Sequence, residues 1–219
     1  MDVAEALKRR ISIRAFTSAP VSETLLREIL EVARFAPSGG NLQPWRVIAV
    51  AGAARDAVIA VAKANLPGAE DDRPVYPANL WEPYRSRRYK VGEDMYALLG
   101  IGRDDKPARH MHLAKNFEFF GAPAGLFFVI DKGMGHGQWA HLGMFMQSIT
   151  LAATERGLAT CMQEAWARMR APLAAHFGLG AQEMIYCGMA LGHADMTNPV
   201  NTLRSERASV DEIAEFRGF

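Results

Sequence analysis

The sequence has 219 residues, a length that suits one domain of upper-middle size. Hydrophobic residues make up 49% and charged residues 22%, so the chain can bury a large core and is neither disordered nor fibrous in composition. The formal net charge is +1, which leaves no overall field to attract nucleic acid or an anionic membrane. Any anion-binding site must therefore be local.

The two cysteines, Cys161 and Cys187, are too few for a disulfide scaffold or a zinc site, and we expect buried free thiols. The first ten residues contain acidic side chains and no apolar core, so they do not form a secretory signal. No run approaches the roughly 20 apolar residues that a membrane helix needs. We expect a soluble cytoplasmic protein.

Helical and extended patterns alternate along the chain. Residues 2–9 are expected to be helical, and residues 11–16 alternate apolar and polar side chains as an extended segment does. Further helices are expected at 22–35, 53–65, 91–100, 105–120 and 138–157. Short apolar runs predict buried strands at 47–51, 126–130, 158–162 and 183–191. The helix at 138–157 is almost wholly apolar, which predicts a central position with burial on most sides.

No repeat or linker divides the chain, so we expect a single domain over residues 1–219. Residues 66–90 are rich in Pro, Arg, Tyr and Trp, and a long irregular excursion of this kind is often a lid. The tail at 198–219 has no core pattern of its own. Strands separated by helices, without a Gly-x-Gly-x-x-Gly motif, indicate an α/β or α+β sandwich rather than a Rossmann unit.

A short basic segment near the N-terminus is a candidate anion site. Arg10, Ser12 and Arg14 fall on one face of the expected extended segment, because the side-chain period of a strand is two. Two guanidinium groups and a hydroxyl that converge there could hold a phosphate and a polyol. A solvated basic edge is the alternative interpretation.

A glycine-containing loop follows the helix expected at 22–35. Gly39 and Gly40 permit left-handed backbone and close approach of N–H groups to a ligand. Ser38 and Asn41 beside them can bond to ribityl hydroxyls or to a ring edge. An ordinary turn between a helix and a strand explains the same four residues.

The order of these blocks resembles the FMN-dependent nitroreductase family. Arg-x-Ser-x-Arg, a helix, and then Pro-Ser-Gly-Gly-Asn-x-Gln-Pro-Trp at 37–45 are similar to the family's first blocks. Residues 116–123, 155–164 and 201–207 resemble the segment before its second core strand, the segment that passes the flavin ring and the terminal basic pair. The resemblance implies an α+β, three-layer sandwich in which helices flank a mostly antiparallel central sheet.

The same resemblance implies a role for each matched basic residue. Arg10 would contact the FMN phosphate or ribityl chain, with support from Ser12. Arg14 would lie towards the pyrimidine edge, where a cation stabilises the anionic reduced flavin. Arg204 and Arg207 would complete the phosphate clamp.

It also implies a homodimer with FMN sites at the interface and the C-terminal tail extended onto the partner subunit. Ser38, Gly39 and Asn41 would reach the FMN of the partner. Backbone around Gln163 and Glu164 would reach the N5 side of the flavin ring. The family's usual glycine after this segment is missing here.

The implied activity is the reduction of nitroaromatics, quinones or activated enones with NADH or NADPH. Hydride would pass to flavin N5 and the nucleotide would leave before the acceptor binds, a ping-pong order. The flavin carries the redox step, so no catalytic side chain is expected. Trp81, Phe119 and Phe120 are candidate walls of the substrate pocket, with core packing as the alternative for the two phenylalanines. A flavin-fragmenting or dehalogenating enzyme of the same fold, or a non-catalytic flavin-binding protein, would also suit the matched blocks.

The densest basic cluster lies inside the expected lid. Arg85, Arg87 and Arg88 are interleaved with Tyr84 and Tyr89. A solvated face is one interpretation, and a gate that attracts nucleotide phosphates or a carboxylated aromatic compound is another. The net charge and the lack of a second basic stripe disfavour nucleic-acid binding.

The histidines do not predict a metal site. His110 and His112 are two residues apart, and His136 and His141 are five apart, so neither pair matches the i, i+4 spacing of a helical metal pair. Structural or surface roles are expected. No nucleophile-elbow pattern surrounds Ser38, which disfavours a hydrolase.

Overall fold

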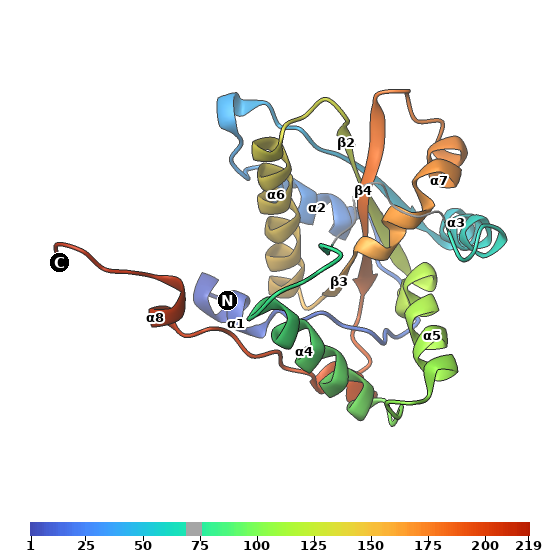
Figure 1. The fold of residues 1–219 in the computed structure, drawn as a ribbon. Helices are drawn as coiled ribbons and strands as arrows, with labels where there is room; N and C mark the ends of the chain where they lie inside the picture. The colour runs from blue at the N-terminus through green and yellow to red at the C-terminus, as the bar shows by residue number, and fades with distance from the viewer. Residues whose placement is uncertain (69–75) are drawn as a thin grey trace.

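A four-stranded antiparallel sheet forms the centre of the computed structural model, which describes residues 1–68 and 76–219. The strand order is β1 (Arg46–Ala51), β2 (Ala124–Asp131), β4 (Glu183–Gly192) and β3 (Ala159–Gln163). Helices cover both faces of the sheet (Figure 1), so the α+β, three-layer fold expected from the sequence is confirmed.

The two central strands divide the core into two halves. Leu126 and Phe128 of β2 face the cluster beneath α2 (Glu23–Ala33) and α6 (His136–Glu155). Phe127 and Val129 face the opposite cluster, beneath α3 (Gly52–Ala64) and α7 (Arg170–Phe177). The alternation follows the period of two in a strand, and both faces are covered, which explains why β2 and β4 read as continuous apolar runs.

Two glycines in the central strands make room for large aromatic rings. A Cβ at Gly125 would overlap the Phe119 ring, and a Cβ at Gly188 would overlap the Trp166 indole. The two rings lie with their centroids 4.9 Å apart, and both side chains are fully buried. The sheet therefore has hollows at these positions that the aromatic side chains fill.

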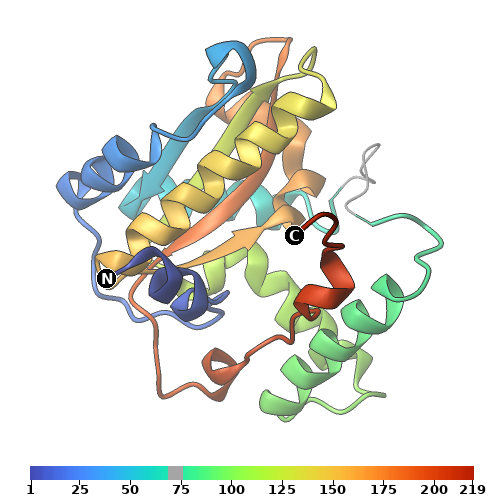
Figure 2. The ribbon, with the colours of Figure 1, turned by 90° about the vertical axis from the view of Figure 1, so that its left-hand side faces the viewer.

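Helix α6 is buried on the side that faces the sheet. Leu142, Phe145 and Ile149 form its buried stripe, and Trp45 stacks on Phe145 at 4.7 Å between centroids. Its outer side is uncovered (Figure 2), and Met144 is 46% exposed there. The expectation that this helix is buried on most sides is therefore wrong for a single chain.

The N-terminal segment has the expected form. Helix α1 (Val3–Arg9) is capped by the Asp2 side chain, which accepts a hydrogen bond from the Glu5 amide. The chain then runs extended, with isolated β-bridges from Ser12 to Thr160 and from Phe16 to Ala194. The first of these bridges places the basic segment beside strand β3.

Two expected helices have different bounds in the structure. Helix α4 runs from Tyr84 to Leu98, so the irregular lid expected through residue 90 is wrong from Tyr84 onward. Helix α5 ends at Ala114, where the 3-10 segment η2 (Lys115–Gly121) begins, and the chain then passes through left-handed backbone at Phe119 and Phe120, both at φ 52°. Part of the expected lid, residues 69–75, lies outside the described residues.

Short elements complete the chain. The 3-10 helices η1 (Gly39–Asn41) and η3 (Glu164–Met169) follow α2 and β3. The tail contains η4 (Pro199–Thr202) and the four-residue helix α8 (Val210–Ile213). Within the described ranges, no helix has the length and apolar character needed to span a membrane, and no group of three metal-ligating side chains occurs.

Candidate functional site

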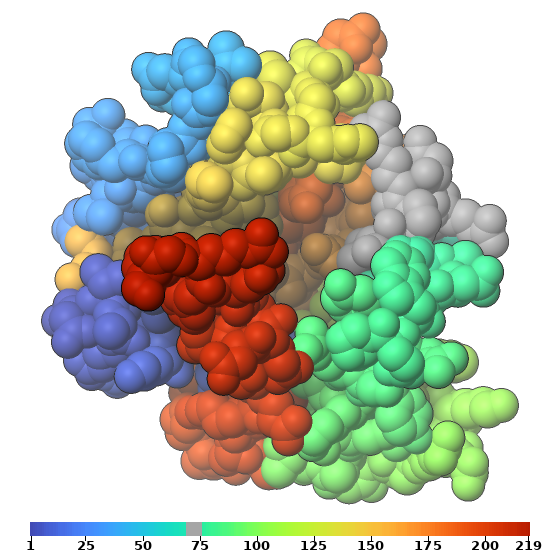
Figure 3. Space-filling model, turned by 60° about the vertical axis from the view of Figure 1, so that its left-hand side comes forward, coloured from blue at the N-terminus to red at the C-terminus, as the bar shows by residue number. Residues whose placement is uncertain are grey.

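A cavity of about 970 Å³ opens where β3 ends, between η3, α5 and the start of α4. Figure 3 shows this face hollowed between α6, α4 and the C-terminal tail. Its inner wall is buried and includes Cys161, Gln163 and Phe120, whereas Tyr76, Arg88 and Arg168 line it from exposed positions. The cavity therefore has a closed inner end on the sheet and an open mouth.

Backbone hydrogen bonds fix the basic segment at the edge of this cavity. The Ile13 amide donates to the Thr160 carbonyl at 3.0 Å, and the Arg14 amide donates to Asn201 Oδ1 at 2.8 Å. Asn201 Nδ2 in turn donates to the Ala15 carbonyl at 2.8 Å. Asn201 is fully buried, so the start of the C-terminal tail holds the N-terminal segment in register. The sequence placed Asn201 in the terminal block at 201–207, but it did not predict that Asn201 anchors the N-terminal segment.

Positive charge gathers at this edge without matching acids. Burial, and then the charge of Arg207, lowers the pKa of Arg10, which places these two guanidinium groups near each other. Arg14 lines the cavity. Within the described part of the chain, Arg10, Arg14, Arg204 and Arg207 have no carboxylate within 4.0 Å. Four unpaired cations from the two ends of the chain are the kind of donor set that an anionic ligand such as a phosphate needs.

The end of β3 and the segment that follows it line the cavity. The side chain of Gln163 is buried and already bonded, because its Nε2 donates to the Asn116 carbonyl at 2.7 Å and its Oε1 accepts from Trp166 Nε1 at 3.3 Å. Glu164 lines the cavity beside it, and burial raises the pKa of its carboxyl group. Gln163 thus positions the strand end, and its amide group is not free for a ligand.

The three proposed walls of the substrate pocket have different locations. Phe120 lines the cavity. Phe119 does not reach it, because its ring is fully buried in the core beside Phe127 and Trp166, so that expectation is corrected to core packing. Trp81 is 59% exposed and packs edge-on against Tyr84, outside the residues that line the cavity.

Ser38, Gly39 and Asn41 lie far from the basic segment of the same chain. The Gly39 amide donates to His141 Nδ1 at 3.3 Å, near the start of α6. Helix α1 borders the other half of α6, around Ser148 and Leu151. Figure 1 shows the 38–43 loop and α1 at opposite ends of this helix. One chain therefore does not bring the two predicted sets of cofactor ligands together.

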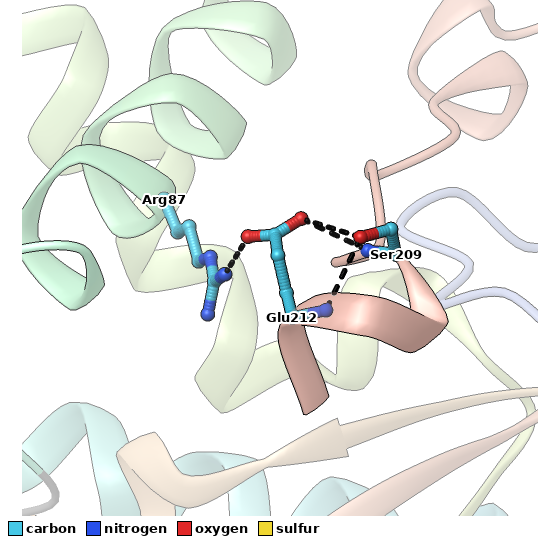
Figure 4. Close-up of polar contacts among 3 residues, drawn as sticks. All are labelled: Arg87, Ser209 and Glu212. Carbon is cyan, nitrogen blue, oxygen red and sulfur yellow. Dashed lines mark hydrogen bonds and ion pairs between the residues drawn. The ribbon is translucent and has the colours of Figure 1, made fainter. Parts of the chain in front are cut away.

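Polar contacts hold the C-terminal tail against helix α4. Arg87 donates to Glu212 at 3.1 Å, and Glu212 also forms a reciprocal cap with Ser209 at the start of α8 (Figure 4). Lys90 contacts Glu206 at 3.4 Å. These pairs hold the segment that carries Arg207 next to the helix that carries Arg88.

His112 is a buried polar residue of the cavity wall with no assigned partner. It is 4% exposed and lies between the rings of Tyr96 and Phe120. Its Nε2 has no hydrogen-bond partner among the described atoms. Burial, followed by the charges of Lys115 and Arg14, lowers the pKa of His112 to about 4, so its ring is neutral near pH 7. The sequence suggested only a structural or surface role.

Comparisons with known proteins agree on the family. A family model described as the nitroreductase family matches residues 7–193. The chain is 38% identical over 212 residues to 4-nitrobenzoate reductase of Pseudomonas putida, which covers 96% of this chain and 93% of the relative.

Two solved structures are similar over nearly their whole length. One is the FMN and NADPH-dependent nitroreductase NfnB from Sphigopyxis sp. strain HMH, with a TM-score of 0.97, 44% identity and 100% coverage of both chains. The other is FMN-dependent NfnB from Mycobacterium smegmatis in complex with NADPH, with a TM-score of 0.91, 30% identity and coverage of 98% and 97%. The chain therefore belongs to the nitroreductase family.

Proposed function

We propose that this protein is an FMN-dependent oxidoreductase that reduces nitroaromatic compounds with NADH or NADPH. The observation that carries the proposal is the cluster of guanidinium groups at the edge of a large cavity on the sheet, none of which has a carboxylate partner in the described part of the chain. Relatives named for nitroaromatic reduction and for dependence on FMN and NADPH support the same assignment.

The residues present fit the cofactor. Arg10, Arg204 and Arg207 would hold the FMN phosphate, because their charges are not matched by nearby acids among the described residues. Ser12 would support the ribityl chain, and Arg14 would lie at the pyrimidine edge. The chemistry that bound FMN supplies is the transfer of a hydride equivalent from a nicotinamide nucleotide to an oxidised acceptor.

The chain's own residues supply position and electrostatics. Arg14 keeps a fixed positive charge on the cavity wall, where it stabilises negative charge that develops on a ligand. Phe120, Met162 and Ala165 give the wall an apolar surface that excludes water. A single cavity of about 970 Å³ is large enough for donor and acceptor to bind in turn, which supports a ping-pong order and a range of flat acceptors that includes quinones and activated enones.

We further propose that the active form is a homodimer. Ser38, Gly39 and Asn41 lie at the opposite end of α6 from the basic segment, so they can serve an FMN only in a partner subunit. Exposed apolar side chains gather on the elements along this face: Met1, Val3, Leu7, Val32, Phe35, Leu42 and Met144. Pairing of two chains here would bury them, and the C-terminal tail would then extend over the partner.

The test begins with the purified protein loaded with FMN. NADPH or NADH added without oxygen should bleach the flavin absorbance, and a nitroaromatic compound added afterwards should restore it. A flavin that neither nucleotide bleaches would favour the non-catalytic alternative. Bleaching without reoxidation by the nitroaromatic compound, together with loss of reduced FMN under oxygen, would favour a flavin-fragmenting enzyme.

A further inference from the structure

We propose that Arg88 and Arg168 form an anion-binding subsite at the mouth of the cavity, which selects aromatic acceptors that carry a carboxylate. This inference rests on the proposed function and names the substrate class of that site. Of the basic cluster Arg85, Arg87 and Arg88, it assigns a ligand-binding role to Arg88 alone.

The cations near the start of α4 are not equivalent. Arg85 pairs with Glu82 at 2.7 Å and Arg87 with Glu212 at 3.1 Å, and neither is among the residues that line the cavity. Lys90 pairs with Asp94 at 2.8 Å. Arg88 lines the cavity, and no carboxylate of the described residues lies within 4.0 Å of it.

An aromatic ring holds the Arg88 side chain in place. Its guanidinium carbon lies over the Tyr76 ring, 4.1 Å from the centroid, and Tyr76 also lines the cavity. A guanidinium that lies over an aromatic ring keeps the N–H groups in its own plane free, so they can donate to a second group. The stack therefore orders the cation and leaves its hydrogen-bonding edge available.

Arg168 adds a second cation from the sheet side of the cavity. It belongs to η3, it is exposed, and it too has no acidic partner among the residues that the structure describes. Glu164 is the one carboxylate among the described residues of the lining, against Arg14, Arg88 and Arg168. The described lining is therefore positive, and two of its three cations, Arg88 and Arg168, are exposed.

This arrangement orients a ligand with two different ends. A flat acceptor that binds with its reducible group on the inner wall places its opposite end near Arg88 and Arg168. A carboxylate at that end can accept paired hydrogen bonds from a guanidinium fork, whereas a neutral amide of the same shape cannot. A phosphate of the nicotinamide nucleotide offers the same chemistry, and the experiment below separates the two sources.

The experiment compares 4-nitrobenzoate with 4-nitrobenzamide as acceptors for the FMN-loaded enzyme. We expect wild-type protein to favour the acid in kcat/KM by about tenfold, the effect of one charge-assisted contact near solvent. Arg88→Gln and Arg168→Gln should each bring this ratio towards one. Arg85→Gln is the matched control, because Arg85 lies on the same helix, is paired with Glu82 and does not line the cavity.

A second readout does not depend on turnover. Calorimetric titration with benzoate, which cannot be reduced by this route, should give a Kd about tenfold weaker for Arg88→Gln than for wild type and for Arg85→Gln. High salt should weaken benzoate binding to wild type more than to Arg88→Gln, because it screens the charge. Circular dichroism of each variant checks that the fold is intact.

Equal kcat/KM values for acid and amide in wild type, with benzoate binding unchanged in Arg88→Gln and Arg168→Gln, would overturn the subsite. A loss confined to NADPH relative to NADH would assign the anion to the nucleotide phosphate and overturn the carboxylate assignment. If no nitroaromatic compound is reduced at all, the proposed function fails, and benzoate binding still decides whether the subsite exists.

Discussion

In strands β2 and β4 nearly every residue is buried, whereas helix α4 and the C-terminal tail, which flank the cavity, are exposed along most of their length. The strands are held by apolar packing on both faces. The contacts between α4 and the tail are ion pairs near solvent, such as Arg87 with Glu212. Full burial of a large apolar side chain stabilises by about 1.5–3 kcal/mol, and an exposed ion pair by about 0–1 kcal/mol.

This difference in packing assigns folding stability and acceptor selection to different parts of the molecule. The inner wall of the cavity stands on the sheet, so the groups expected to contact the flavin ring are fixed by the core. The mouth of the cavity depends on α4 and its neighbours, where substitutions cost little stability. Changes in acceptor preference should therefore arise from α4 and η3, and changes in folding from β2 and β4.

The largest expected effect comes from a glycine in the central sheet. In Gly125→Ala the new methyl group would overlap the fully buried Phe119 ring, which has no space to move into. We expect the free energy of unfolding to fall by about 3 kcal/mol or more, measured by urea denaturation.

Gly92→Ala is the matched control in α4. Gly92 lies inside the helix, and a Cβ there meets nothing within 4 Å. We expect a gain of about 0.5–1 kcal/mol, because alanine restricts the unfolded chain and favours the helix. Similar losses of stability at Gly125 and Gly92 would contradict the difference in packing between the central sheet and helix α4.

An intermediate effect is expected from His112 as pH falls. Its pKa of about 4 in the folded protein lies below the ordinary value of 6.5, so the unfolded chain binds a proton more readily. The stability contributed by the neutral ring is present above pH 6.5 and is lost as pH falls towards 4, by up to about 3 kcal/mol.

Melting temperatures of wild type and His112→Gln, measured from pH 7 to pH 4, check this effect. The variant should lose less stability than wild type over this window, whatever its stability at pH 7. Parallel curves would show that protonation of His112 does not cause the loss of stability at low pH.

The smallest effect is expected in the tail. Glu212→Gln removes the charge that pairs with Arg87 and weakens the reciprocal cap with Ser209. We expect no measurable change in the free energy of global unfolding, because these groups are exposed. Hydrogen exchange should nevertheless become faster at residues 209–214. A large global loss would mean that the tail belongs to the cooperative core.

The sequence predicted the sheet well because its strands are short apolar runs between turn residues. It failed at the start of α4, since residues 84–90 contain no aliphatic side chain that could mark an apolar stripe of a helix. It also missed the left-handed turn at Phe119 and Phe120, because such residues rarely adopt this backbone conformation. The aromatic packing of Phe119 against Trp166 over Gly125 and Gly188 favours that turn.

For the site, ordered motifs predicted the candidate ligands but not their surroundings. The contact between Arg14 and Asn201 joins residues 187 positions apart, and no local pattern announces it. The burial of His112, and the lack of a carboxylate beside Arg88 among the described residues, likewise depend on neighbours from distant segments. Which arginine of a basic cluster faces a cavity is a tertiary property, and the sequence alone left that question open.

The central claim is that guanidinium groups from both ends of the chain hold FMN. The most direct measurement is the ratio of flavin to protein absorbance after gel filtration, for wild type and for the double variant Arg10→Ala with Arg207→Ala. We predict one FMN per chain in wild type, which should elute at twice the chain mass of 24.1 kDa, and loss of flavin from a folded double variant. A yellow double variant with full FMN occupancy would contradict this claim.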